Sequence, residues 1–334
     1  MKPSAVEPGP VPVAEVVRSS ARALSAAGID SAHAEAQLIC AHVLGVDRAG
    51  LMLVDSIEAA DVAEVGRVVA SRVADRTPLQ YLLGRAVSGR LDLAVGPGVF
   101  IPRPETELLV DWILSALPAP GVSPAPVVVD LCAGSGTLAL EIAHARPDVR
   151  VHAVELHAAA FDWLRHNARE RADAGDTPIE LHRADATDPE LLAHLRGRVA
   201  AVVSNPPYIP FTEDLPADVI SHEPATALFG GTDGLAVVTP LVDVAAALLA
   251  PGGRLAVEHD DTTGPAVAAV VSARGGFGNV DQHNDLAGRP RFVTATRTTA
   301  RRDGLDDGST VEDAGDDAGD DDEDDTRTQK GITR

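Results

Sequence analysis

The sequence predicts an α/β protein whose main domain is built on a parallel, doubly wound sheet. From Val127 onward, short valine-rich runs alternate with segments of helix length, which is typical of parallel strands joined by helical crossovers. A glycine-rich turn follows the first of these strands, and an Asn-Pro-Pro-Tyr segment follows a later one. Both segments belong to the carboxyl edge of the predicted sheet, where open α/β sheets bind ligands.

The chain before this sheet has a different character. Residues 1–10 are rich in proline, and we expect a flexible N-terminus. Between residues 11 and 76, apolar residues recur at steps of three and four, for example from Val62 to Val73. This spacing predicts three to five short helices. Small helical bundles are most often scaffolds or docking surfaces, and we interpret this one as a substrate-docking domain.

Residues 77–103 predict a β-hairpin linker between two domains. Apolar and polar residues alternate over Leu91–Val95 with the period of a half-buried strand. Phe100–Glu107 follows, and its prolines hold the chain extended until Pro104 opens a helix, with two glutamates close to the positive helix end. A linker bracketed by prolines explains this segment as well as a role in lining a site does.

The main domain is predicted to span residues 104–299. A helix is expected at 138–145, and strands are expected at 127–130, 151–155, 179–182, 199–204, 255–258, 277–282 and 291–297. Residues 300–334 contain hardly any large apolar side chain, so burial cannot offset the entropy of ordering them. We therefore expect a disordered acidic tail there.

The charge and the cysteine content indicate which partners and which cellular compartment to expect. The formal net charge is −22, of which residues 301–334 contribute −8 and residues 1–300 contribute −14. An acidic body argues against general phosphate attraction, so we expect no direct nucleic-acid binding. The cysteines Cys40 and Cys132 suggest neither a disulfide framework nor a metal site. Without an export signal or an apolar run of about 18 residues, the expectation is a cytoplasmic protein with no membrane span.

The turn Asp130–Gly136 indicates a nucleoside-containing cofactor. Its glycines let backbone approach a ligand, and Glu155 ends the next strand, where an acid can accept hydrogen bonds from both ribose hydroxyls. The third glycine of a dinucleotide fingerprint is absent, and Asp130 would repel a pyrophosphate but suits an ammonium group. S-adenosylmethionine, which becomes S-adenosylhomocysteine, fits better. The predicted cofactor residues are Asp130, Cys132, Ala133, Gly134, Ser135, Gly136, Glu155, Asp185, Ala186 and Asn205, with Asp185 and Ala186 bordering the adenine.

The segment Asn205–Tyr208 has the groups needed to hold a planar amino group. Prolines lack an N–H, so the carbonyls of Asn205 and Pro206 have few local donors and can accept hydrogen bonds from a guest. The segment also carries an amide oxygen and the flat ring of Tyr208. An amide nitrogen is a poor nucleophile because its lone pair is delocalised, so acceptors that hold its hydrogens orient it for in-line attack. Taken alone, the segment is explained equally well as a proline-rich turn.

Five segments together resemble the release-factor glutamine N(5)-methyltransferases, over about residues 11–297. They are Phe100–Glu107, Asp130–Gly136, Ser204–Tyr208, Glu223–Leu235 and Asp285–Val293. The resemblance implies a Rossmann-like class I methyltransferase domain that methylates the glutamine amide in the Gly-Gly-Gln loop of peptide chain release factors. It also implies catalytic roles for Asn205, Pro206 and Tyr208, and a substrate pocket made by these residues with Pro207, Phe100 and Arg103. Cys132 replaces a common glycine, and Glu155 a common aspartate.

Three alternatives stay open at this point. An adenine-N6 methyltransferase acting on nucleic acid would share Asn-Pro-Pro-Tyr, but it requires a basic groove or a target-reading segment. A glutamine of a ribosomal protein is a substrate that these motifs do not distinguish from a release factor. A non-catalytic cofactor-binding module that docks on a translation factor would leave Asn205–Tyr208 unexplained. We expect a monomer.

Overall fold

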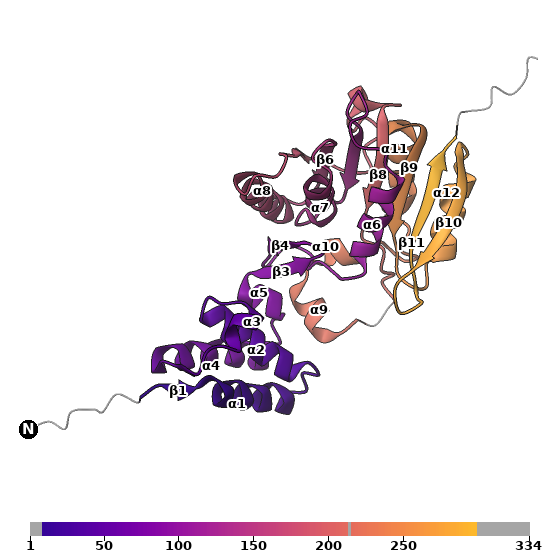
Figure 1. Cartoon of the computed structure of the whole chain (residues 1–334). Helices are drawn as coiled ribbons and strands as arrows, with labels where there is room; N and C mark the ends of the chain where they lie inside the picture. The colour runs from indigo at the N-terminus through magenta and orange to yellow at the C-terminus, as the bar shows by residue number, and fades with distance from the viewer. Residues whose placement is uncertain (1–8, 213–214, 299–334) are drawn as a thin grey trace, which may run out of the picture. The chain divides into compact units, whose positions relative to one another are not determined.

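A computed structural model describes residues 9–212 and 215–298 (Figure 1). Most of the segment expected to be a flexible N-terminus, residues 1–8, lies outside the described residues, as does the expected acidic tail, residues 300–334. The helices within residues 9–212 and 215–298 are each too short or too polar to span a lipid bilayer.

Helices form where the three- and four-residue apolar spacing predicts them. They are α1 (Val13–Ala26), α2 (Ala32–Val43), α3 (Arg48–Leu51) and α4 (Ala59–Ala74). One buried cluster that includes Leu24, Ile39 and Val65 joins their apolar faces, which stabilises helices too short to persist alone. An unexpected antiparallel bridge pairs β1 (Val11–Pro12) with β2 (Ser56–Ile57) at the edge of this bundle.

The expectation of a hairpin over all of residues 77–103 is wrong for its first part. Leu79–Leu83 form helix α5, and only β3 (Arg85–Ser88) and β4 (Leu91–Ala94) make the hairpin. Leu79 is buried in the core of the helical bundle, and this packing stabilises a helix at residues 79–83. Gly84 ends that helix in the left-handed conformation, at φ 72°.

A seven-stranded sheet confirms the α/β fold class. The strand order is β10-β11-β9-β8-β5-β6-β7. The five strands from β9 to β7 run parallel, while β11 and β10 run antiparallel to their neighbours. The strands are β5 (Val127–Leu131), β6 (Arg150–Glu155), β7 (Glu180–Arg183), β8 (Val199–Ser204), β9 (Leu249–Glu258), β10 (Phe277–Asn284) and β11 (Pro290–Arg297).

Strand β9 begins six residues before the expected start at Leu255. It continues directly from the preceding helix and includes Pro251-Gly252-Gly253, which we expected to precede the strand. The pairing with β8 shifts register between Val199 and Ala201, opposite this part of β9. Such an irregularity is where a sheet tolerates proline and glycine.

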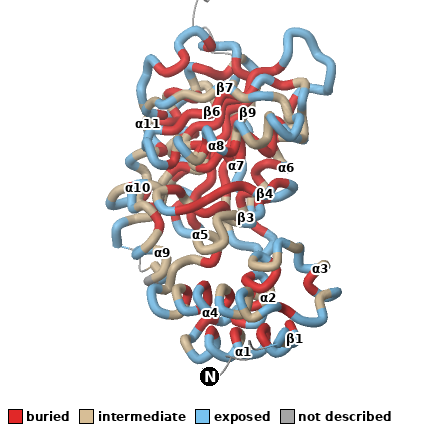
Figure 2. Tube along the Cα trace, turned by 90° about the vertical axis from the view of Figure 1, so that its left-hand side faces the viewer, coloured by how far each residue is buried: buried red, intermediate tan, exposed pale blue. Residues whose placement is uncertain are grey.

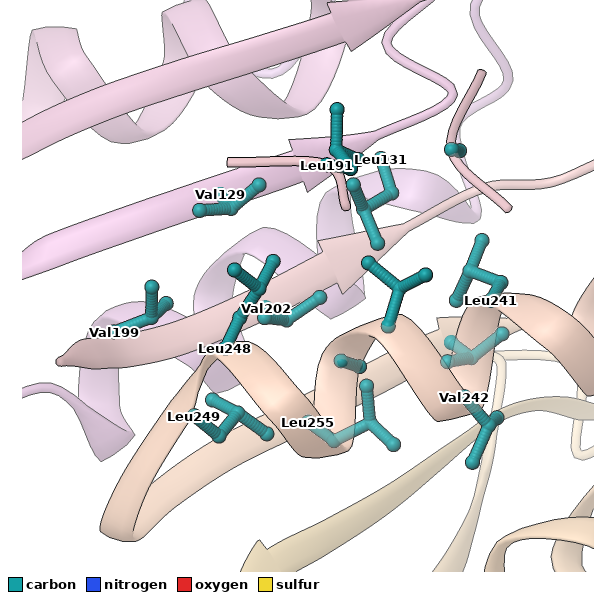
Figure 3. Close-up of a cluster of buried hydrophobic side chains, with 14 of the residues drawn as sticks. Val129, Leu131, Leu191, Val199, Val202, Leu241, Val242, Leu248, Leu249 and Leu255 are labelled. Carbon is teal, nitrogen blue, oxygen red and sulfur yellow. The ribbon is translucent and has the colours of Figure 1, made fainter. Parts of the chain in front are cut away.

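Helices cover both faces of the sheet and bury two separate cores. One core includes side chains of α11 (Val238–Leu248) and α12 (Gly264–Ala273). The other includes side chains of α6 (Thr106–Ala116), α7 (Thr137–Ala145) and α8 (Ala158–Asp173). Figure 3 shows Leu241, Val242 and Leu248 of α11 beside strand residues such as Val202. The strands between these layers are largely buried (Figure 2). Close packing on both faces fixes the positions of the strand ends at the carboxyl edge of the sheet.

Candidate active site

A cavity of about 310 Å³ lies at the carboxyl edge of the parallel strands. Most of the predicted cofactor residues line it, although they come from four separate strand ends. These are Asp130, Cys132, Ala133, Gly134, Ser135, Glu155, Asp185, Ala186 and Asn205. Predicted substrate residues Phe100 and Pro207 line it as well, together with residues of the Glu223–Leu235 segment such as Thr226. The volume suits a small-molecule ligand.

Asp130 places a buried carboxylate oxygen at this cavity without a partner. The residue is fully buried, and its Oδ2 accepts a hydrogen bond of 3.0 Å from the Ala139 N–H of helix α7. Its Oδ1 has no hydrogen-bond partner among the described residues. Burial raises the pKa of Asp130 well above its usual range, and the Ala139 N–H opposes this. A cationic ligand group would remove the cost of keeping this acid ionised.

Glu155 is oriented by backbone groups of the turns around it. Its Oε2 accepts from the Gly134 N–H at 2.9 Å, and its Oε1 accepts from the His157 N–H at 2.8 Å. Each carboxylate oxygen has a second lone pair, so acceptor capacity remains for a ligand hydroxyl. Asp185 is held in a similar way, since its Oδ1 accepts from the Thr187 N–H and hydroxyl.

The two glycines of the turn have different roles. Gly134 lines the cavity at φ 57°, and an added Cβ would meet no atom within 4 Å. Gly136 does not line the cavity, and at φ 96° its missing Cβ makes room for Leu140 and Leu164, each 2.8 Å from where that atom would stand. Gly136 therefore permits close packing of two helices on the turn.

Asn205 is connected to a buried polar network that sequence reasoning did not identify. Its Nδ2 donates to the Thr106 hydroxyl oxygen at 3.4 Å, and that hydroxyl donates to Glu258 Oε2 at 2.8 Å. The Tyr208 hydroxyl donates to Glu258 Oε1 at 3.1 Å. Tyr208 and the buried Pro206 do not line the cavity. The available signal was that Glu258 ends a predicted strand, as Glu155 does.

The Glu223–Leu235 segment packs directly on the Asn205–Tyr208 segment. An isolated parallel bridge pairs Ile209 with Phe229. A Cβ at Gly230 would stand 2.6 Å from the Pro207 carbonyl oxygen, and one at Gly234 would overlap the Tyr208 carbonyl oxygen. Only glycines allow this approach, so this segment holds the backbone of Asn205–Tyr208 in place.

Arg103 acts on the cavity through Phe100. The guanidinium carbon lies 4.7 Å from the centre of the Phe100 ring, and Arg103 forms an ion pair with the buried Glu223. The other oxygen of Glu223 accepts from the Ile101 N–H at 3.1 Å. Phe100 lines the cavity and Arg103 does not. The arginine thus braces the aromatic wall.

One side-chain cluster outside the cavity has separations compatible with a metal ion. The ligand atoms of His152, Glu180 and His182 lie within 4.8 Å of one another. His152 Nδ1 and His182 Nε2 are 3.0 Å apart, and burial lowers the pKa of both imidazoles. Arg150 already donates to Glu180 at 3.1 Å. A histidine–histidine hydrogen bond and this ion pair account for the cluster.

Comparisons with known proteins identify the family of this chain. The PrmC N-terminal domain family matches residues 15–84, and the methyltransferase small domain family matches residues 92–266, just over half of the chain. The release factor glutamine methyltransferase of Mycolicibacterium smegmatis is 49% identical over 282 residues, which cover 84% of this chain and 96% of that protein. The one of Corynebacterium glutamicum is 44% identical over 286 residues, 85% of this chain and 98% of that protein.

A solved structure of similar description is that of a release-factor-specific protein-(glutamine-N5) methyltransferase from Alicyclobacillus acidocaldarius. It is 30% identical, with a TM-score of 0.36, and the match covers 62% of this chain and all of that one. Sequence identity over nearly the whole length of the curated relatives shows that the chain belongs to the family of release factor glutamine methyltransferases.

Proposed function

We propose that this enzyme transfers a methyl group from S-adenosylmethionine to the side-chain amide nitrogen of the glutamine in the Gly-Gly-Gln loop of peptide chain release factors. The observation that carries the proposal is the position of Asn205, which lines the same cavity as the buried Asp130 and the oriented Glu155. The names of the relatives support a release factor as the substrate, and they do not favour nucleic acid or a ribosomal protein.

The cavity residues fit the proposed methyl donor. The unpartnered Oδ1 of Asp130 would hold the ammonium group, Glu155 would accept from the ribose hydroxyls, and Asp185 with Ala186 would border the adenine. When bound, S-adenosylmethionine supplies an electrophilic methyl group on a positively charged sulfur. The acidic residues at the cavity suit this cation.

The residues after β8 would prepare the glutamine amide. The Asn205 side-chain oxygen, at the cavity, would accept one of its N–H groups, and the Pro206 carbonyl would accept the other although the Pro206 residue does not line the cavity. Together they would orient the nitrogen and stabilise the positive charge that develops on it. Phe100, braced by Arg103, would close the wall around the side chain. The nitrogen would be cationic after attack and would then lose one proton to water, so no strong base is required.

The direct test uses labelled S-adenosylmethionine and purified release factor, beside a release factor whose loop glutamine is replaced by alanine and beside nucleic acid. We expect label on the unaltered factor only. Label on nucleic acid alone would refute the proposal, because Asn205–Tyr208 would then hold a base.

Asp130→Asn is expected to weaken S-adenosylmethionine binding about 10- to 100-fold, because hydrogen bonds to charged groups contribute about 1.5–3 kcal/mol. The amide can still accept from the Ala139 N–H, so the fold should persist. Isothermal titration calorimetry measures the change. The matched control is Glu141→Gln, a buried acid outside the cavity that accepts from the Arg90 and Leu91 N–H groups. Equal affinities for Asp130→Asn and the wild type would contradict the role of Asp130.

Removal of residues 301–334 is expected to leave methylation of a release factor in vitro unchanged. The matched relatives align over 84–85% of this chain, and this acidic segment lies beyond the family resemblance. Initial rates of the shortened and full chains at equal enzyme concentration decide the question. A large loss of rate in the shortened chain would show that the tail takes part in docking.

We further propose that three parts of the chain have separate roles. Residues 11–84, which include helix α5, would dock the release factor, residues 85–103 would link the two domains, and residues 104–299 would carry most of the chemistry. The match of the PrmC N-terminal domain to residues 15–84 supports a separate first domain. We propose a monomer that acts in the cytoplasm with its translation substrates, and light scattering of the purified enzyme tests the monomer.

A further inference from the structure

Glu258 receives hydrogen bonds from two hydroxyl groups, and one of them belongs to Thr106, which lines the cavity. It ends strand β9 and is 1% exposed. The Thr106 hydroxyl at the start of α6 donates to its Oε2 at 2.8 Å, and the Tyr208 hydroxyl donates to its Oε1 at 3.1 Å. Thr106 is itself only 2% exposed. Glu258 thus joins β9, α6 and the segment after β8 in one buried network.

The direction of these hydrogen bonds follows from the charge on Glu258. An ionised carboxylate only accepts, so the Thr106 hydroxyl must donate its single hydrogen to it. The Thr106 oxygen then remains as an acceptor, and it receives the Asn205 Nδ2 at 3.4 Å. With its NH₂ turned toward Thr106, the Asn205 amide keeps Oδ1 for a partner in the cavity.

We propose that Glu258 is a positioning residue, which as a carboxylate acts through Thr106 to keep the Asn205 side-chain oxygen directed at the substrate amide. This inference rests on the proposed function. If Glu258 were protonated, it could donate to Thr106, and the Thr106 hydroxyl could then donate to Asn205 Oδ1. The Asn205 NH₂ would turn toward the substrate, where it would oppose the N–H groups of the glutamine.

The surroundings of Glu258 place this change near neutral pH. Burial raises the pKa of Glu258 to about 7, and Glu105 of the α6 N-terminal region adds to this. The hydrogen bonds from Thr106 and Tyr208 and the charge of Arg291 on β11 lower it. Because the active orientation needs the ionised form, which exists above the pKa, kcat should fall as pH drops through about 7.

The test measures kcat, KM and S-adenosylmethionine affinity on both sides of pH 7 for full-length wild type, Glu258→Gln, Thr106→Val and Thr106→Ser. We expect kcat above pH 7 to fall about tenfold in Glu258→Gln and Thr106→Val, as for one lost oriented hydrogen bond. Their pH step near 7 should disappear while cofactor affinity is unchanged. Thr106→Ser keeps the hydroxyl and should restore both rate and pH step.

The outcomes separate this inference from the proposed function. Wild-type enzyme that does not methylate a release factor refutes the function. Active wild type together with an unchanged pH step in Glu258→Gln and Thr106→Val overturns the role of Glu258 alone. A merely structural role would lower the melting temperature and leave the pH profile as it is. Glu141→Gln, which alters another buried acid, is the matched control and should keep the pH step.

Discussion

Asn205→Ala is expected to lower kcat about 10²- to 10³-fold, the range seen when one oriented group that stabilises a transition state is removed. The Asn205 side chain lines the cavity and its NH₂ is directed to Thr106. The substitution therefore removes the side-chain oxygen that would accept a hydrogen bond from the glutamine amide. Affinity for S-adenosylmethionine should be nearly unchanged, because positioning of the amide matters most in the transition state. Rates under saturating conditions and calorimetric affinities measure the two effects separately.

The control for this substitution is Asn284→Ala. Asn284 lies on β10, is exposed and does not line the cavity, so its replacement should leave kcat at the wild-type value. If Asn205→Ala turned over like the wild type, Asn205 would have no role in the reaction. A loss accounted for entirely by weaker cofactor binding would assign Asn205 to the cofactor instead.

Gly234→Ala is expected to lower the free energy of unfolding by about 3 kcal/mol or more. At φ 75° a Cβ costs about 1–2 kcal/mol by itself, and at this position it would also overlap the Tyr208 carbonyl oxygen. Relief of that overlap must move the backbone of Tyr208 or of the Glu223–Leu235 segment. We therefore expect kcat to fall together with stability, and urea denaturation and rate measurements check this.

Gly28→Ala separates the two contributions. Gly28 also has φ 75°, but no atom lies within 4 Å of where its Cβ would stand. This variant should lose only the conformational cost, about 1–2 kcal/mol, and keep its kcat. Equal losses of stability in the two variants would show that the close approach to Tyr208 contributes nothing.

Much of the cofactor site followed from the sequence because its signals are local. Valine-rich runs with helix-length spacing predict a parallel sheet, and the carboxyl ends of parallel strands meet at one edge. Asp130, Glu155 and Asp185 each follow such a run, so their convergence on one cavity could be predicted without knowledge of strand order. The Asn205–Tyr208 segment could be assigned to the same edge of the sheet, because it also directly follows a valine-rich run.

Tertiary packing decided the features that depend on distant neighbours. Residues 79–83 form a helix because Leu79 is buried in the bundle core, which local alternation does not reveal. The contact of Glu258 with Thr106 and Tyr208 exists because β9 lies next to β8 in the sheet and α6 packs over it. Periodicity and turn chemistry depend on a few consecutive residues. A hydrogen-bond network depends on which strands become neighbours in the sheet, and local patterns do not contain that information. The sequence by itself therefore determined the fold class and the acidic residues and Asn205 that meet at the cavity. The tertiary structure decided which other residues complete the cavity and what orients them, because those contacts join segments far apart in the chain.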